Sequence, residues 1–92
     1  MIMATIRIPT PMRTLTRNQA EVQASGATVG EVLRDLDARY PGMNARILDE
    51  RGAVRRYVNI FLNDEDVRAL QSLDTPVKDA DRITLIPAMA GG

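Results

Sequence analysis

The sequence lacks several of the residues on which enzymes most often depend. Its 92 residues include no cysteine, no histidine and no tryptophan, and only two tyrosines and one phenylalanine. Without cysteine the chain has no disulfide, no thiolate nucleophile and no sulfur ligand for a metal. Without histidine it has neither the commonest general base nor the commonest ligand of transition metals. We therefore expect a protein that is not an enzyme, with no catalytic residue, no metal site and no bound cofactor of its own.

A net charge and long hydrophobic runs are also missing. Twelve basic residues balance twelve acidic ones, so the formal net charge is zero. A neutral chain has no electrostatic attraction for nucleic acid or for anionic lipid, and neither is expected as a partner. No apolar run approaches the ~20 residues of a membrane span, and the N-terminal residues lack the layout of a signal peptide. These absences favour one small cytoplasmic domain.

The N-terminal quarter of the chain predicts a β-hairpin. Residues 2–8 alternate between apolar and polar positions, which is typical of a half-buried strand. Pro9 and Pro11 end this strand, because proline cannot donate to a strand ladder. Residues 12–19 are mostly polar and are expected to form a loop. Residues 20–24 alternate again and are expected to pair with the first strand.

The clearest local signal is a helix over residues 29–40. Thr28 and Glu31 fit a capping box, in which the Thr28 hydroxyl accepts from the Glu31 amide and the Glu31 carboxylate reaches back to Thr28. Asp35 precedes Arg39 by four residues, the favourable order for an ion pair on a helix. Apolar residues recur at helical spacing and predict one buried stripe: Val29, Val32, Leu33, Leu36 and Tyr40.

Short strands and turns make up the second half of the chain. We expect a short helical turn over residues 43–48, a third strand over 57–62 and a final strand over 82–86. The order of elements is therefore a hairpin, a helix, and two or three strands, with no internal repeat. This order predicts an α+β fold with one sheet and one main helix packed across one of its faces.

The last five residues differ from the domain that precedes them. Apart from one methionine they are small, and they end in Gly91-Gly92. Glycine loses more conformational entropy on ordering than any other residue, so fold stability does not account for this pair. An extended tail of this length would carry its terminal carboxylate roughly 16–18 Å from the domain. A frayed chain end is the alternative explanation. We expect a globular domain over residues 1–87 and a flexible tail over residues 88–92.

Four segments are more informative together than any one of them alone. They are the N-terminal Ile6-Arg7-Ile8-Pro9, the helix opening at 28–33, the segment 58–68, and the strand 83–87 that runs into Ala90-Gly91-Gly92. In this order they resemble the MoaD/ThiS family of ubiquitin-like sulfur carrier proteins, over nearly the whole chain. The segment 58–68 is most similar to the branch that serves cysteine biosynthesis. The resemblance implies a β-grasp fold, a mixed sheet with the first and last strands side by side in its middle.

The resemblance also implies a chemical role for Gly92. An adenylating, E1-like enzyme would use ATP and Mg²⁺ to convert its carboxylate to an acyl-adenylate, and a sulfur donor would convert that to a thiocarboxylate. The preceding residues would be required for entry into the partner's active site: Ala88, Met89, Ala90 and Gly91. In cysteine biosynthesis the sulfur would pass to a serine derivative on a pyridoxal-phosphate enzyme, and a metalloprotease would release the cysteine.

Two other roles of the same tail stay open. As the small subunit of molybdopterin synthase, the chain would insert the tail into a larger subunit and donate sulfur to a pterin precursor. As a ubiquitin-like modifier, it would be joined through the tail to lysine side chains. The final acceptor is a property of the partners, and the sequence does not name it. We expect a sulfur carrier of cysteine biosynthesis and keep these two roles as alternatives.

An aromatic pair predicts where a partner docks. Tyr57 and Phe61 lie four residues apart on the third predicted strand, on the side opposite to the helix. Ile86 faces the same side if the last strand also alternates. Exposed apolar side chains on a sheet face indicate a docking surface, although ordinary cross-strand packing is the alternative. We name Tyr57, Phe61 and Ile86 the predicted docking surface.

Overall fold

A computed structural model describes residues 2–87 of the chain. The elements follow the predicted order, with three short 3₁₀-helices (η) added between them. None of the helices in this part of the chain combines the length and the hydrophobicity that crossing a membrane requires. In chain order the elements are β1 (Met3–Arg7), η1 (Thr10–Thr16), β2 (Glu21–Ser25), α1 (Val29–Arg39), α2 (Met43–Ile47), β3 (Val58–Leu62), β4 (Glu65–Asp66), η2 (Val67–Ala69), η3 (Ser72–Asp74) and β5 (Arg82–Pro87).

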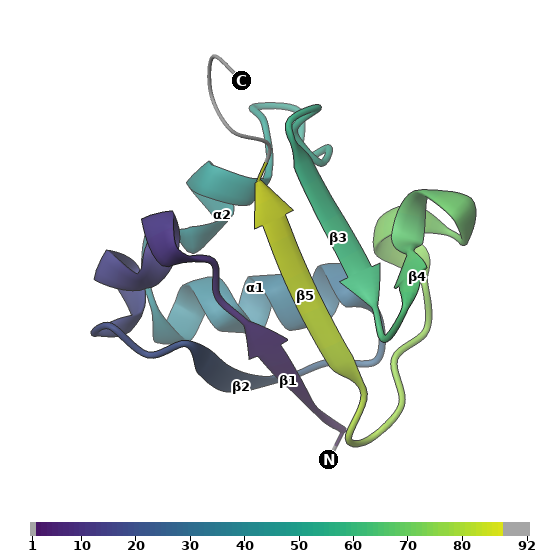
Figure 1. The fold of residues 1–92 in the computed structure, drawn as a ribbon. Coiled ribbons are helices and arrows are strands. Elements are labelled where there is room, and N and C mark those ends of the chain that lie inside the picture. The colour runs from purple at the N-terminus through teal and green to yellow at the C-terminus, as the bar shows by residue number, and fades with distance from the viewer. Residues whose placement is uncertain (1, 88–92) are drawn as a thin grey trace.

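The five strands form one mixed sheet in the order β2-β1-β5-β3-β4 (Figure 1). β1 pairs antiparallel with β2 and parallel with β5, and β3 pairs antiparallel with β5. The helix α1 crosses one face of the sheet (Figure 1). The first and last strands therefore lie side by side in mid-sheet, as expected for a β-grasp fold.

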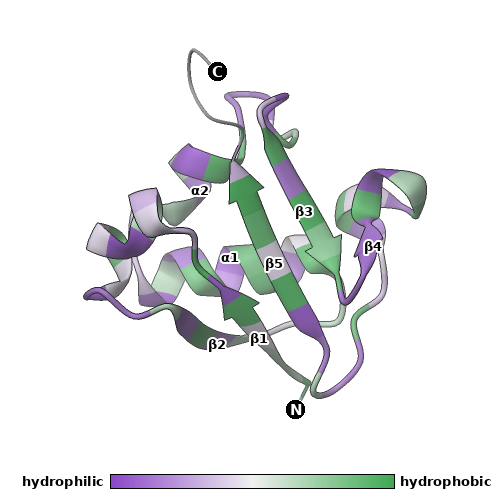
Figure 2. Cartoon of the chain, viewed as in Figure 1, coloured by the Kyte–Doolittle hydropathy of each residue, from purple (hydrophilic) through white to green (hydrophobic). Residues whose placement is uncertain are grey.

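The core lies between α1 and one face of the sheet. Burial alternates along the strands, and the inward side chains Ile6, Ile60 and Ile83 are at most 1% exposed. The predicted stripe of α1 is confirmed: Val29, Val32, Leu33 and Leu36 are fully buried, and Tyr40 packs partly buried against them. The central strand β5 is mainly hydrophobic after its first residue (Figure 2). Each buried aliphatic side chain contributes about 1.5–3 kcal/mol, so this face supplies most of the stability.

One of the two hydrogen bonds of the predicted capping box is present at the start of α1, and the other has a different partner. The Thr28 hydroxyl accepts from the Glu31 amide at 3.2 Å, as predicted. The Glu31 carboxylate accepts from the amide of Ala27 at 3.0 Å instead of reaching Thr28. The helix ends at Arg39, one residue early, because Tyr40 precedes a proline and leaves the helical region with φ −134° and ψ 82°.

The prediction of a loop over residues 12–19 is wrong for residues 12–16, which belong to η1. Met12 and Thr16 of this 3₁₀-helix are buried, at 5% and 0% exposure. The Thr16 hydroxyl donates to the Gln19 carbonyl at 2.9 Å, so this buried polar group has a hydrogen-bond partner. Short 3₁₀-helices carry no periodic pattern that the sequence could reveal. The burial of Met12 against the rest of the core is a tertiary effect.

A carboxylate fixes the connection between α1 and α2. Asp37 accepts from the backbone amides of Gly42 at 3.2 Å and Asn44 at 3.1 Å. Gly42 has φ +102°, a left-handed conformation that glycine adopts without steric cost. The helical turn predicted over residues 43–48 is present as α2, and it buries Met43 and Ile47.

Candidate functional site

The predicted carrier residue lies outside the described part of the chain. Gly92 and the tail residues Ala88, Met89, Ala90 and Gly91 all follow Pro87, the last residue that the structure describes. Their roles therefore stay predictions. The structure does describe how the strand leading to them is held in the sheet.

The strand β5 has different neighbours along its two halves. β1 pairs only with Arg82–Thr84, whereas β3 pairs with Ile83–Pro87. Leu85–Pro87 are therefore paired with a strand on one side only in the described sheet, and we call these three residues the base of the tail. A groove of about 350 Å³ runs along the base of the tail, with Arg7 and Arg13 among its lining residues.

Part of the predicted docking surface is open on the outer face, the sheet face away from α1. Ile86 of β5 is 45% exposed. Tyr57 is 51% exposed, but it lies in the turn before β3 and not on the strand as predicted. Together they make two of the three large hydrophobic side chains that are exposed within residues 2–87. Phe61 is less exposed than predicted, because Thr84 lies opposite it on one side and Asp66 on the other. The structure therefore leaves Tyr57 and Ile86 as the accessible members.

Charged side chains occupy the other end of the outer face. The Glu21 carboxylate is 2.8 Å from the Arg82 guanidinium and 3.7 Å from that of Arg7. All three side chains are about half exposed, so each pair contributes little to stability.

The segment 58–68 contacts β5 at its middle residue and folds back on its own strand, β3, at its end. Asn63, in a left-handed turn with φ +56°, donates its amide to the Arg82 carbonyl at 2.7 Å. Its side-chain oxygen accepts from the Arg82 amide at 3.1 Å. Arg68 reaches β3, where its guanidinium donates to the Asn59 side-chain oxygen at 2.8 Å. Sequence reasoning missed these contacts, although this segment carries much of the family resemblance.

Within residues 2–87, two carboxyl groups have pKa values below their ordinary range, and both stabilise turns or connections of the fold. The pKa of Asp35 is lowered mainly because the Ser25 backbone amide donates to its carboxylate, with Arg39 adding a 2.7 Å ion pair. The pKa of Asp49 is lowered by hydrogen bonds from the backbone amides of Ala53 and Arg51. Asp35 lies on α1 and Asp49 follows α2, so neither belongs to the outer face of the sheet.

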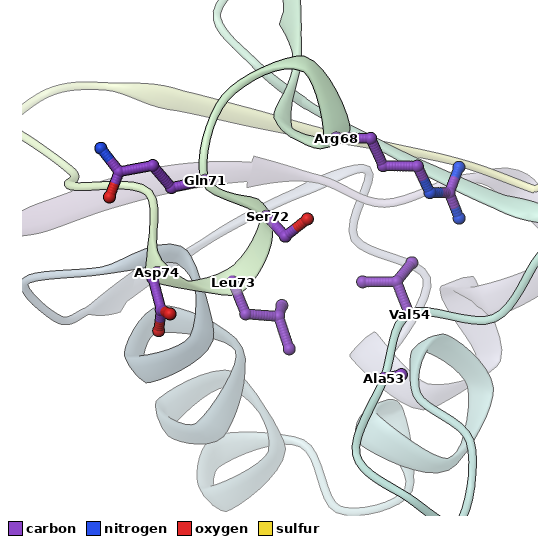
Figure 3. A pocket seen from close by; sticks show the side chains of 7 residues that line it. All are labelled: Ala53, Val54, Arg68, Gln71, Ser72, Leu73 and Asp74. Atoms are coloured by element: carbon purple, nitrogen blue, oxygen red, sulfur yellow. The ribbon is translucent and has the colours of Figure 1, made fainter.

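No arrangement of side chains within residues 2–87 is suited to holding a metal ion. Among the acidic residues 64–66, Asp66 instead accepts the backbone amide of Arg68 at 2.9 Å. A groove of about 520 Å³ lies beside η2 and η3. Leu73 and Val54 approach it from opposite sides, and Arg68 lies at its rim (Figure 3).

Comparisons with known proteins give consistent results. The sequence profile of the ThiS family matches residues 6–92. The chain is 47% identical over 90 residues to the sulfur carrier protein CysO of Mycobacterium tuberculosis, covering 96% of this chain and 97% of that one. It is 39% identical over 66 residues to small archaeal modifier protein 3 of Haloferax volcanii, covering 72% and 71%. CysO in the crystal structure of the Amycolatopsis orientalis BexX/CysO complex matches with a TM-score of 0.91 at 44% identity, covering 97% and 99%.

Proposed function

The chain belongs to the ThiS family, and on this premise we infer that it is a sulfur carrier protein of cysteine biosynthesis. The observation that carries the inference is the 47% identity to a sulfur carrier over 96% of the chain. We further propose that the carboxylate of Gly92 is the group that carries sulfur. The family profile extends through this residue.

The chemistry of a carboxylate explains why partners are needed. A free α-carboxyl group has a pKa of about 3.3–3.7, so it is an anion at neutral pH and a poor electrophile. Attack of its oxygen on the α-phosphorus of ATP releases pyrophosphate and leaves an acyl-adenylate. A sulfur donor then displaces AMP and forms the thiocarboxylate. We assign both steps to partner enzymes, with ATP and Mg²⁺ held at the adenylating partner, because this chain has no histidine or cysteine.

We propose that the adenylating partner docks on the outer face at Tyr57 and Ile86. Both side chains are about half exposed, and burying them against a partner would remove apolar surface from water. Ile86 belongs to the base of the tail, so a partner seated there would receive the tail directly. Sulfur-accepting enzymes, such as a pyridoxal-phosphate enzyme and a metalloprotease, would use the same tail afterwards.

Intact mass measurement tests the role of Gly92. The carrier is mixed with its adenylating enzyme, ATP and a sulfide source. We expect a gain equal to the mass difference between sulfur and oxygen, and no gain after deletion of Gly92. Gly52→Asn is the matched control, because Gly52 lies in an open turn at φ +82°, a conformation that asparagine tolerates. An unchanged wild-type mass, with a partner that demonstrably exchanges pyrophosphate into ATP, would contradict the proposal.

Charge placed at Ile86 tests the docking surface. We expect Ile86→Glu to lower kcat/KM of adenylation about tenfold or more, because a carboxylate would have to be desolvated at the interface. Leu70→Glu is the control, since Leu70 is a comparably exposed hydrophobic residue, at 39%, that follows η2 and lies outside the predicted docking surface. Equal losses in both variants would show that the effect is not specific to this face.

The 39% identity to a small archaeal modifier protein favours one second candidate, a modifier joined to lysines. A modifier would give a series of higher-mass conjugates in cell extracts, and deletion of Gly92 would remove them. A carrier would give a single thiocarboxylated species. Immunoblotting of extracts from wild-type and Gly92-deleted cells separates the two roles.

A further inference from the structure

The residues that hold the base of the tail lie themselves at an edge of the sheet. Leu85–Pro87 are paired only with Val58–Ile60 of β3 in the described sheet. β4 has two residues and pairs only with Phe61 and Leu62. The first half of β3 therefore has β5 on one side and no strand on the other. An unpaired edge of this kind leaves backbone groups without a ladder partner.

The Arg68 side chain occupies that edge in place of a strand. Its Nη2 donates to the carbonyl of Val58 at 2.8 Å and to that of Arg55 at 2.9 Å. Its Nη1 donates to the side-chain oxygen of Asn59 at 2.8 Å. One guanidinium thus joins the two β3 residues that lie opposite Ile86 and Pro87.

The backbone of Val58 shows which way this stretch of β3 faces. Its amide donates to the Arg55 carbonyl at 3.0 Å, and its carbonyl accepts from Arg68. Both backbone groups of Val58 are therefore engaged away from β5. Because backbone groups alternate in direction along a strand, those of Asn59 are directed toward Ile86. Arg68 therefore holds one edge of this short segment of β3, and the opposite edge of the same segment pairs with the base of the tail.

An arginine is suited to this position in a way that lysine is not. Its acceptors are two carbonyls and a side-chain amide rather than a carboxylate, so the contacts depend on the planar fork of donors and not on pairing of opposite charges. The backbone at Arg68 is fixed as well, because the Asp66 carboxylate accepts its amide at 2.9 Å. The side chain is thus anchored at both ends.

We propose that Arg68 and Asn59 are positioning residues for sulfur transfer. They hold β3 against the base of the tail and so set the direction in which the chain leaves the domain. This role rests on the proposed function of Gly92. The base is the point at which the domain and its docking surface are joined to the tail, and misplacement of a reacting group by about 1 Å can cost up to 10²-fold in rate.

Amide hydrogen exchange of the carrier alone tests the structural half. In Arg68→Lys we expect the amides of Asn59 and Ile86 to exchange about tenfold faster or more, because a lysine cannot satisfy all three acceptors. Amides of β2 should keep their wild-type rates. Arg82→Lys is the matched control, since Arg82 also makes a 2.8 Å side-chain hydrogen bond but at the start of β5. Unchanged exchange at Asn59 and Ile86 in Arg68→Lys would overturn the proposal.

Steady-state kinetics with the adenylating enzyme, ATP and sulfide test the functional half. Arg68→Lys should lower kcat about tenfold and leave KM within about twofold, since the docking side chains are retained. Asn59→Ala should lower kcat by a smaller factor, because it removes only one of the three acceptors of Arg68. A wild-type kcat in Arg68→Lys, or an equal loss in Arg82→Lys, would overturn the role. A wild-type carrier that takes up no sulfur would instead contradict the proposed function, whatever the exchange rates.

Discussion

The two faces of the sheet are made by the same strands and differ in almost every other respect. On the inner face, Ile6, Ile60 and Ile83 are closed off from water by α1 and the rest of the core. On the outer face, Arg7 and Ile86 are exposed, and α1 lies across the opposite face of the sheet (Figure 1). One step along a strand therefore moves from a position that stabilises the fold to a position that a partner can reach. Stability and partner recognition are separated by the period of two of a β-strand.

Truncation of a core residue should give the largest difference between the faces. Leu33 of α1 is fully buried, so Leu33→Ala should lower the free energy of unfolding by about 2–5 kcal/mol. Ile86→Ala on the outer face should cost less than about 1 kcal/mol, because much of that side chain is already in water. Urea denaturation measures both values. Similar losses for the two variants would contradict the division between the faces.

A hydrogen bond between α1 and β2 should have an intermediate effect that depends on pH. The Asp35 carboxylate accepts from the Ser25 amide at 2.9 Å, and Asp35→Asn should cost about 1–2 kcal/mol at pH 7. The pKa of Asp35 is lower in the folded state, so the unfolded chain binds more protons in this range. The stabilisation is therefore present above the unfolded pKa of about 4 and is lost as pH falls through the folded pKa.

Denaturation of wild type and Asp35→Asn at several pH values measures this effect. The difference in unfolding free energy between the two proteins should shrink as the solution is acidified below pH ~4. A difference that stays constant down to strongly acidic pH would show that the charge of Asp35 does not contribute.

Removal of an outer-face ion pair should have the smallest effect. Glu21 contacts two arginines, but all three side chains are about half exposed, so Glu21→Gln should cost less than about 1 kcal/mol. The loss should also decrease at high salt, because exposed charges are screened. Urea denaturation at low and high salt measures it. A loss as large as that of Leu33→Ala would mean that the outer face also holds the fold together.

Local patterns predicted the elements better than their assembly. Helical spacing and the Thr28–Glu31 pair were sufficient for α1, because the contacts that begin a helix are only a few residues apart. The strands followed from alternation, but their order in the sheet followed only from the family resemblance. Pairing of β1 with β5 joins residues more than seventy positions apart, and no local pattern encodes it.

The parts of the site that depend on residue type and on strand alternation could be predicted from the sequence. The outward position of Ile86 was predicted from strand alternation and is confirmed by its exposure. Tyr57 is exposed too, but it lies in the turn before β3 and not in the strand. The role of Gly91-Gly92 was predicted from the family resemblance, and it lies outside the described residues. Phe61 was placed on the correct face, but the side chains opposite it reduce its exposure. The contacts of Arg68 were not predictable, because they depend on β4 being too short to cover the first half of β3. Strand length is decided by the tertiary fold. The helix η1 was missed because its formation also depends on tertiary packing, through the burial of Met12.

Fragmentation mass spectrometry of the protein isolated from its own cells tests the central claim most directly. The claim is that the domain presents the tail, and that the terminal carboxyl group is the reactive part of the chain. The account predicts a fraction of molecules in which one oxygen is replaced by sulfur, with the added mass confined to the fragment that contains Gly92. Sulfur found on another residue, or none under conditions in which the carrier is needed for growth, would contradict it.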